Sequence, residues 1–143
     1  MTWLDVLSQW LHLAFAAVAV GGVIYARMVA LPALGQAAEA ARRTALEGLV
    51  ARMRPLWFSA IGVLLVSGLY NLARSAPGKP PVYHMLVGVK ILLALHVFAS
   101  LFLAGLPGTG EAGSESRRGR RLVGAAISGL VILLLSAYLR RSF

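Results

Sequence analysis

Lys90 and His96 lie well inside the stretch Val82–Leu106, which otherwise has largely the composition of a lipid-soluble helix. An ionisable group at membrane depth costs a few kcal/mol or more, so it usually faces a partner, a cavity or a cofactor. His12 lies in a second apolar stretch near the start of the chain, and His84 is the remaining histidine. Imidazole and amine groups at such depth can bind a metal, hold a cofactor or carry protons.

The spacing of these residues limits which of them can act together. Lys90 lies roughly 12 Å into its helix and His12 about 9 Å into its own, at 1.5 Å per residue, so the two are predicted at a similar depth. His84 is predicted near the outer interface and His96 near the bilayer centre. Six residues separate His84 from Lys90 and Lys90 from His96, a rotation of about 240° each time. At most two of the side chains of His84, Lys90 and His96 can therefore face the same cavity.

Three chemistries are compatible with these residue types. A haem iron takes neutral imidazole on one or both axial positions, and a Lys or Arg neutralises a propionate. Copper also accepts imidazole, with thioether sulfur from Met28, Met53 or Met85. Proton transfer would use histidine and lysine as relay groups, although the apolar segments contain no Asp or Glu to complete the usual pathway.

A column of small residues follows His12 along one face of its predicted helix. Its members recur at spacings of three and four: Ala16, Ala19, Val23, Ala26 and Ala30. One interpretation is tight helix packing, with His12 hydrogen-bonded to a serine or a backbone carbonyl. The other is a shelf that admits a large planar ligand beside the imidazole. Spacing alone leaves both open.

Composition predicts the fold that positions these groups. The chain is 59% hydrophobic and 13% charged, which does not fit a soluble domain of 143 residues. Long apolar segments approach the roughly 20 residues that cross a bilayer. We predict an all-α integral membrane four-helix bundle forming a single transmembrane domain over 1–143. The helices are expected at about 4–31, 55–73, 82–106 and 122–139. The chain has no cysteine, which excludes disulfides and thiolate metal sites.

Local signals refine these elements. Thr2 and Asp5 form a capping box for the first helix, and Met1–Trp10 lacks the basic start of a cleavable signal peptide. Apolar residues at helical spacing between Ala33 and Arg54 predict a cytoplasmic amphipathic helix that connects helices one and two, or continues into helix two. Pro55 would stand in a first turn, where its missing N–H is tolerated. Pro107–Ser116 is predicted to be a loop.

The basic residues predict orientation and a lipid partner. The two longer connections carry eight arginines: Arg42, Arg43, Arg52, Arg54, Arg117, Arg118, Arg120 and Arg121. The opposite side carries only Arg74, Lys79, Arg140 and Arg141. The positive-inside rule therefore makes the richer connections cytoplasmic and both termini external. The six arginines at 42, 43, 117, 118, 120 and 121 would contact anionic headgroups. This distribution argues against nucleic acid, and Arg27 is expected to snorkel toward the headgroups.

The order of these residues resembles two related membrane families. Trp10-Leu11-His12, Gly21-Gly22, Tyr25, Arg27 and Leu31-Pro32-Ala33-Leu34 are similar to the first helix of HemJ-type protoporphyrinogen oxidases and of CopD-type copper-resistance proteins. Arg52-Met53-Arg54-Pro55, leading to Gly68, resembles their next helix, and Lys90 resembles the lysine of their third. The HemJ-like resemblance implies a haem-associated bundle, with His12 as a ligand and Arg27 and Lys90 as functional basic residues. Val20 departs from that pattern, which has an aromatic residue there.

We therefore expect a haem b-binding protein of a bacterial-type inner membrane, with redox or porphyrin-related activity of the HemJ-like oxidoreductase type. The expected cofactor-binding residues are His12, His96, Lys90 and Arg27, and the candidate metal ligands are His12, His96 and His84. The alternatives are a copper-handling or copper-transport protein, and a non-catalytic accessory subunit of a larger membrane complex. A homo-oligomer is also compatible with the sequence. Neither the substrate nor the electron partner can be predicted.

Overall fold

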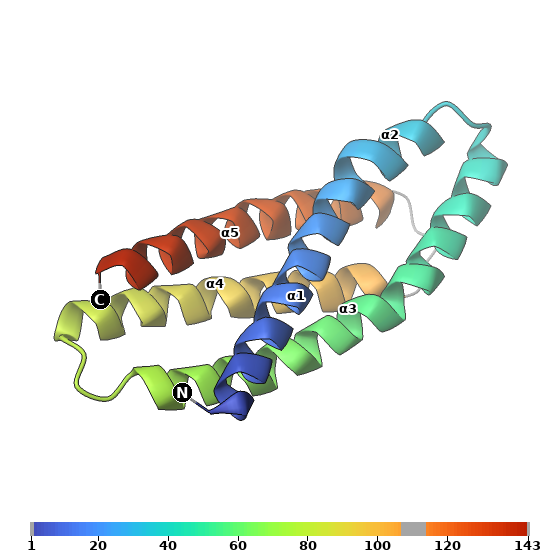
Figure 1. Ribbon diagram of the computed structural model, residues 1–143. Coiled ribbons are helices and arrows are strands. Elements are labelled where there is room, and N and C mark those ends of the chain that lie inside the picture. The colour runs from blue at the N-terminus through green and yellow to red at the C-terminus, as the bar shows by residue number, and fades with distance from the viewer. Residues whose placement is uncertain (1, 107–113, 143) are drawn as a thin grey trace.

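The protein is an all-α four-helix bundle, seen here in a computed structural model that describes residues 2–106 and 114–142 (Figure 1). The elements are α1 (Trp3–Tyr25), the π-helix η1 (Ala26–Ala30), α2 (Leu31–Leu34), α3 (Glu39–Ser75), α4 (Pro81–Gly105) and α5 (Ser114–Ser142). Helix α1 packs against α3 and α5, and α4 packs against the same two helices, so α1 and α4 lie on a diagonal. Both chain ends lie at one end of the bundle, here called the terminal end. The opposite end, which carries the starts of α3 and α5, is the arginine-rich end.

The first helix begins at the predicted capping box. The Thr2 hydroxyl accepts from the Asp5 backbone N–H at 3.3 Å, and the Asp5 carboxylate accepts from the Thr2 N–H at 2.7 Å. The helical path then runs beyond the predicted end at residue 31, through η1 and α2 to Leu34. Pro32 is compatible with this continuation because it lies in the first turn of α2, where its missing N–H is not needed.

The second long helix is continuous with the predicted amphipathic connection. Helix α3 spans 37 residues, or about 55 Å, well beyond the roughly 30 Å of a bilayer core. The predicted start at Pro55 is therefore wrong: this proline lies inside α3, in an α-helical stretch that continues on both sides. Leu46 and Val50 are buried, so the apolar face of the extension packs onto the bundle.

The last two helices also differ from their predicted bounds. Helix α4 starts at Pro81 and ends at Gly105, within one residue of the prediction. Helix α5 starts eight residues earlier than predicted, because Ser114 to Arg121 is helical, and it continues to Ser142. Of the predicted loop Pro107–Ser116, the last three residues belong to α5 and residues 107–113 lie outside the described chain.

The core is built from small residues around one tryptophan. Ala19, Val23 and Ala26 of the α1–η1 path are almost fully buried, as are Trp57 and Ala60 of α3. Residues of α4 and α5 complete the cluster: Val97, Leu101, Ala104, Leu122 and Ala125. Alanines permit close approach between backbones, as is common in helix packing within membranes.

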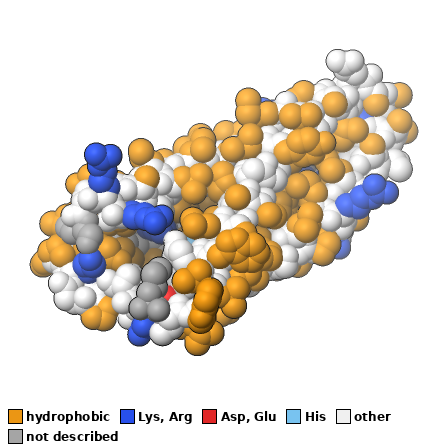
Figure 2. Space-filling model, viewed as in Figure 1, with side chains coloured by type: hydrophobic (Ala, Val, Ile, Leu, Met, Phe, Trp, Pro, Cys, Tyr) orange, Lys and Arg blue, Asp and Glu red, His pale blue; other side chains and the backbone are white. Residues whose placement is uncertain are grey.

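The surface is that of a multi-pass membrane protein. Four helical segments are long and apolar enough to cross a bilayer: Trp3–Leu34, Glu39–Ser75, Pro81–Gly105 and Ser116–Ser142. Large apolar side chains cover the middle of the face in view, whereas most Lys and Arg side chains lie toward the two ends (Figure 2). Leu92, Leu134 and Val66 are each about 70% exposed, which fits contact with lipid.

Candidate functional site

His12 lies between α1 and α3, in the half of the bundle nearer the terminal end. Its Nδ1 is 3.0 Å from the hydroxyl oxygen of Ser67, which is itself buried. That hydroxyl donates its hydrogen to the Val63 carbonyl at 2.6 Å. Because its one hydrogen is committed, Ser67 accepts a hydrogen bond from Nδ1–H. The imidazole is therefore held as the tautomer whose Nε2 carries a lone pair.

Gly68 makes room for the imidazole ring. A Cβ placed on Gly68 would lie 3.3 Å from His12 Cε1 and 3.7 Å from its Nδ1. The first separation is tighter than ordinary van der Waals contact, so a side chain at this position would push the ring away. Ser67 and Gly68 thus fix the ring's position and its tautomer together.

A second polar pair lies one turn nearer the terminal end. Ser8 donates to the Asn71 side-chain carbonyl at 3.0 Å. The Asn71 Nδ2 atom is buried and has no hydrogen-bond partner within the described residues. Ser8 and His12 are four apart on α1, and Ser67 and Asn71 are four apart on α3, so two helical faces oppose each other. A buried amide without an acceptor is costly in an apolar medium.

Lys90 lies on α4, at a depth similar to that of His12 on α1. Lys90 and His12 each lie nine residues into their helices, about 14 Å by helical rise, and Lys90 is close enough to act electrostatically on His12. The half-buried Lys90 has no hydrogen bond or ion pair with any described residue. The carboxylate of Asp5 does not serve it, because Asp5 is engaged at the terminal end by Arg74 at 3.0 Å and Tyr70 at 2.9 Å.

The other predicted site residues lie elsewhere. His84 is exposed near the start of α4, edge-on to the Tyr83 ring at 5.6 Å between centroids. His96 lies in the contact between α4 and α5, with Nε2 3.1 Å from where a Cβ on Gly124 would stand. Arg27 is exposed in η1, fifteen residues beyond His12 and therefore about 20 Å farther along the helix. The structure brings Lys90 to His12 but does not bring the three histidines, or Arg27, to one point.

Metal ligands are correspondingly dispersed. Within residues 2–106 and 114–142, no group of three or more His, Asp or Glu side chains could hold a metal ion. The methionines considered for copper lie on different elements: Met28 in η1, Met53 in α3 and Met85 in α4. Met28 and Met85 are exposed on the surface. Met28, Met53 and Met85 therefore do not form a shared thioether site for copper.

The column of small residues below His12 is covered by protein. Ala19, Val23 and Ala26 retain 1–3% of their exposure and pack into the core with Trp57. This favours the packing interpretation of the column, and the His12–Ser67 hydrogen bond fits the same interpretation. The column itself is therefore not an open shelf beside the imidazole.

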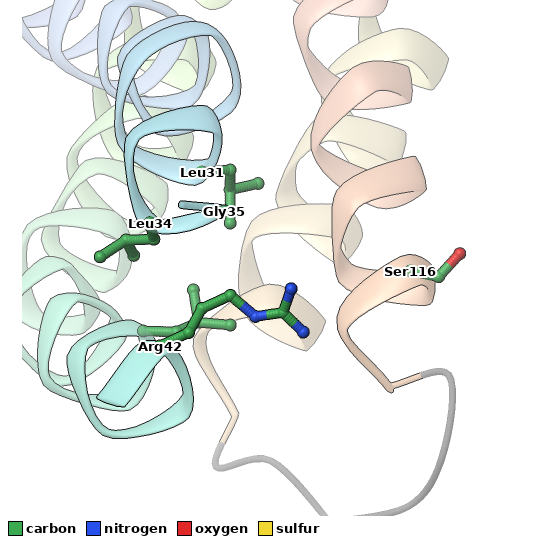
Figure 3. A pocket seen from close by; sticks show the side chains of 6 residues that line it. Leu31, Leu34, Gly35, Arg42 and Ser116 are labelled. Carbon is green, nitrogen blue, oxygen red and sulfur yellow. The ribbon is translucent and has the colours of Figure 1, made fainter. Parts of the chain in front are cut away.

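Two cavities lie at the arginine-rich end. One, of about 250 Å³, is lined by Leu31, Leu34, Gly35, Arg42, Leu46 and Ser116. Arg42 extends from the start of α3 toward α5 across this cavity (Figure 3). The other, of about 580 Å³, lies between η1 and the first turns of α5 and is lined by Arg27, Ser116, Gly119, Arg120, Val123 and Gly124. Both are distant from His12 along the bundle.

The packing interpretation of the sequence predicted a serine or a backbone carbonyl as the partner of His12, and the structure identifies this partner as Ser67. The positions of Ser67, Asn71 and Ser8 were not predicted, because small and polar residues in membrane helices are also typical of close helix packing. A signal was present: each helix carries a polar pair at spacing four, Ser8 with His12 and Ser67 with Asn71. Two such pairs predict a polar contact once two helices are known to be neighbours.

No family model, curated protein or solved structure matches the chain. The resemblance to HemJ-type and CopD-type proteins therefore stays a prediction that depends on the residues quoted for it.

Proposed function

We propose that the protein is a haem b-binding membrane protein with redox or porphyrin-related activity, and that His12 is the axial ligand. The observation that carries this proposal is the chain of hydrogen bonds from His12 Nδ1 through Ser67 to the Val63 carbonyl. A hydrogen bond on one ring nitrogen fixes the tautomer and orientation of a ligating histidine and raises its basicity. Nε2 is left with the lone pair that ferrous or ferric iron accepts.

Two further groups near His12 fit the carboxylates of the same cofactor. Lys90 is a cation without a carboxylate among the described residues, and Asn71 Nδ2 is a buried donor without an acceptor. A porphyrin bearing propionates offers an anion and hydrogen-bond acceptors together with the metal. Bound haem would supply one-electron chemistry. The chain's own residues would hold the iron, neutralise a propionate and exclude water from the apolar surroundings.

The remaining predicted residues take smaller parts in this proposal. His96 is the second candidate ligand, and its position against Gly124 on the α4–α5 side makes a shared axial pair with His12 less favourable. Arg27 lies too far from His12 to serve the same propionate. The protein is proposed to lie in a bacterial-type inner membrane with both termini outside, because the arginines concentrate at the opposite end.

The test is reconstitution of the purified full-length protein with haem b, followed by visible absorption spectroscopy. The wild type is expected to show a Soret band at stoichiometric loading. His12→Ala should lose or strongly shift that band, whereas His84→Ala, which alters an exposed histidine near the start of α4, should keep it. Circular dichroism of each variant checks that the helices persist.

Other outcomes separate the alternatives. A His12→Ala spectrum identical to the wild type would remove His12 as the ligand, and loss of the band in His96→Ala alone would transfer the role to His96. Bound copper without a Soret band in the wild type would favour copper handling. A colourless protein that copurifies with large membrane partners would favour an accessory subunit.

A further inference from the structure

The cavity between η1 and α5 is lined by two arginines and by one apolar side chain, that of Val123. We call it the α5 groove, and define it by Arg27, Ser116, Gly119, Arg120, Val123 and Gly124. Its volume of about 580 Å³ is within the range of small-molecule sites, ≈ 300–1,000 Å³. Arg27 comes from η1 and Arg120 from α5, so two separate elements contribute the charges.

The structure sorts the arginines of this end by what they bind. Arg118 is buried and donates to the Glu47 carboxylate at 3.1 Å and to the Leu106 carbonyl at 3.0 Å. Arg54 donates to the Gly105 carbonyl at 2.7 Å. These two arginines are committed to holding helices together. They are therefore poor candidates for lipid contact, although Arg118 was predicted to make one.

The two arginines of the α5 groove are different. Arg27 has no hydrogen bond or ion pair with any described residue, and Arg120 donates only to the Ser116 hydroxyl, at 3.4 Å. No carboxylate among the described residues lines the groove. Arg27 and Arg120 line the same cavity, so an anion bound there would be attracted by both positive charges. Guanidinium geometry matches phosphate oxygens in a bidentate manner.

The apolar face of α5 next to the groove indicates which kind of molecule bears the anionic group. Val123 lines the groove, and Ile127 and Leu134 continue along the same face of α5, 58% and 70% exposed. Gly119 and Gly124 add no side chain that would block this path. A headgroup phosphate at the arginines would thus lie directly above an apolar face for acyl chains.

We infer that the α5 groove is a binding site for one anionic glycerophospholipid, whose phosphate is held by Arg27 and Arg120 while an acyl chain lies along α5. Basic pockets between transmembrane helices commonly bind such headgroups. The π-helical turn at Ala26–Ala30 carries Arg27, and single π turns inside helices occur often at functional sites. This inference is independent of iron binding by His12, which lies in the other half of the bundle. His96, the second candidate ligand, adjoins the groove at Gly124.

The experiment is native mass spectrometry of the detergent-solubilised protein with phosphatidylglycerol or phosphatidylcholine of matched acyl chains. The wild type should retain one phosphatidylglycerol in preference to phosphatidylcholine. Arg27→Gln and Arg120→Gln should each lower that retention about fivefold, as expected for about 1 kcal/mol per charge. The matched control is Arg140→Gln with Arg141→Gln, an exposed pair at the terminal end that should leave retention unchanged.

Three results would overturn the inference. Equal retention of the two lipids would show that charge does not select the occupant. Equal losses in the groove variants and in the control pair would show that only overall charge matters. Displacement of the lipid by millimolar inorganic phosphate would show that the groove binds a soluble anion and that the apolar face is incidental.

Discussion

At the scale of single residues, the environment of His12 is more specific than its place in an apolar helix indicates. The ring has one nitrogen bonded to Ser67 and one face against Gly68. The Ser67 hydroxyl is the acceptor only because Val63 takes its hydrogen. Removing that hydroxyl therefore tests the tautomer without removing the proposed ligand.

Ser67→Ala is expected to weaken haem binding 10–100-fold, the usual effect of losing an outer-shell partner of a metal-binding histidine. The free energy of unfolding should fall by only about 1 kcal/mol, the typical worth of one hydrogen bond. Titration with haem b, followed at the Soret band, measures the affinity. Ser59→Ala removes an exposed hydroxyl from the same helix and serves as the control. Unchanged affinity in Ser67→Ala would mean that the hydrogen bond serves packing alone.

Lys90 supplies a separate test, because this half-buried residue has no carboxylate partner among the described residues. Lys90→Met keeps the length and apolar stem of the side chain while removing the charge. We expect lower haem occupancy with the helical content unchanged, since the proposed counter-ion is a propionate of the ligand. Full haem occupancy together with a higher melting temperature would show that Lys90 only destabilises the bundle and does not help to bind haem.

The sequence predicted the chemical types at this site but not their grouping. His12 and Lys90 were expected at a similar depth from helical rise alone, and the structure places them within electrostatic reach. Arg27 and His96 were expected in the same set, but the structure separates them from His12. Depth follows from counting residues, whereas the pairing of helix faces depends on packing between segments far apart in the chain. The places of Ser67 and Asn71 beside His12 and Ser8 follow only from the packing of α1 on α3.

At the scale of elements, close packing of α1 on α5 depends on one glycine. A Cβ on Gly129 would stand 2.8 Å from Val20 Cγ2 and 3.3 Å from Cγ1. Val20 is β-branched and stiff in a helix, so it cannot turn away at low cost. The two helices would have to separate.

Gly129→Ala is therefore expected to destabilise the bundle by about 1–3 kcal/mol, the usual range for overpacking. Gly62→Ala is the matched control, because no atom lies within 4 Å of the added methyl and alanine favours a helix. Thermal unfolding in detergent, followed by circular dichroism, compares the two. Val20→Ala should rescue Gly129→Ala if the clash is the cause. Equal melting temperatures for the wild type and Gly129→Ala would contradict the close contact.

Element boundaries could be predicted only where a local signal fixed them. The capping box at Thr2 and Asp5 placed the start of α1. The predicted start of the third membrane helix, at residue 82, is within one residue of the observed start of α4 at Pro81. The predicted start of the second membrane helix at Pro55 is wrong, because a proline at a membrane boundary is typical of a helix start but here lies inside α3. The continuous apolar face at Leu46 and Val50 holds α3 together across that proline by packing on the bundle. Arg118 likewise anchors the early start of α5 through Glu47 and Leu106.

At the scale of the whole molecule, the two ends differ in charge and in how that charge is used. The terminal end carries the Asp5–Arg74 ion pair at 3.0 Å, which joins the start of α1 to the end of α3. The arginine-rich end carries eight arginines from the two longer connections, and η1 adds Arg27 beside α5. The proposed haem ligand and the proposed lipid groove thus occupy opposite halves of one bundle. A change at one is expected to leave the other intact.

This asymmetry predicts that the arginine-rich end faces the cytoplasm. Eight basic residues flank the helices there, against four at the terminal end: Arg74, Lys79, Arg140 and Arg141. Basic residues close to short connections are retained on the cytoplasmic side, so both termini should lie outside. A reporter that is active only outside the cytoplasm should therefore work when fused after Phe143, and should be inactive when inserted after Gln36, between α2 and α3. A fluorescent reporter that folds only in the cytoplasm should give the opposite pattern. The reverse result in both assays would overturn the orientation and would place the Arg27–Arg120 pair in the outer leaflet.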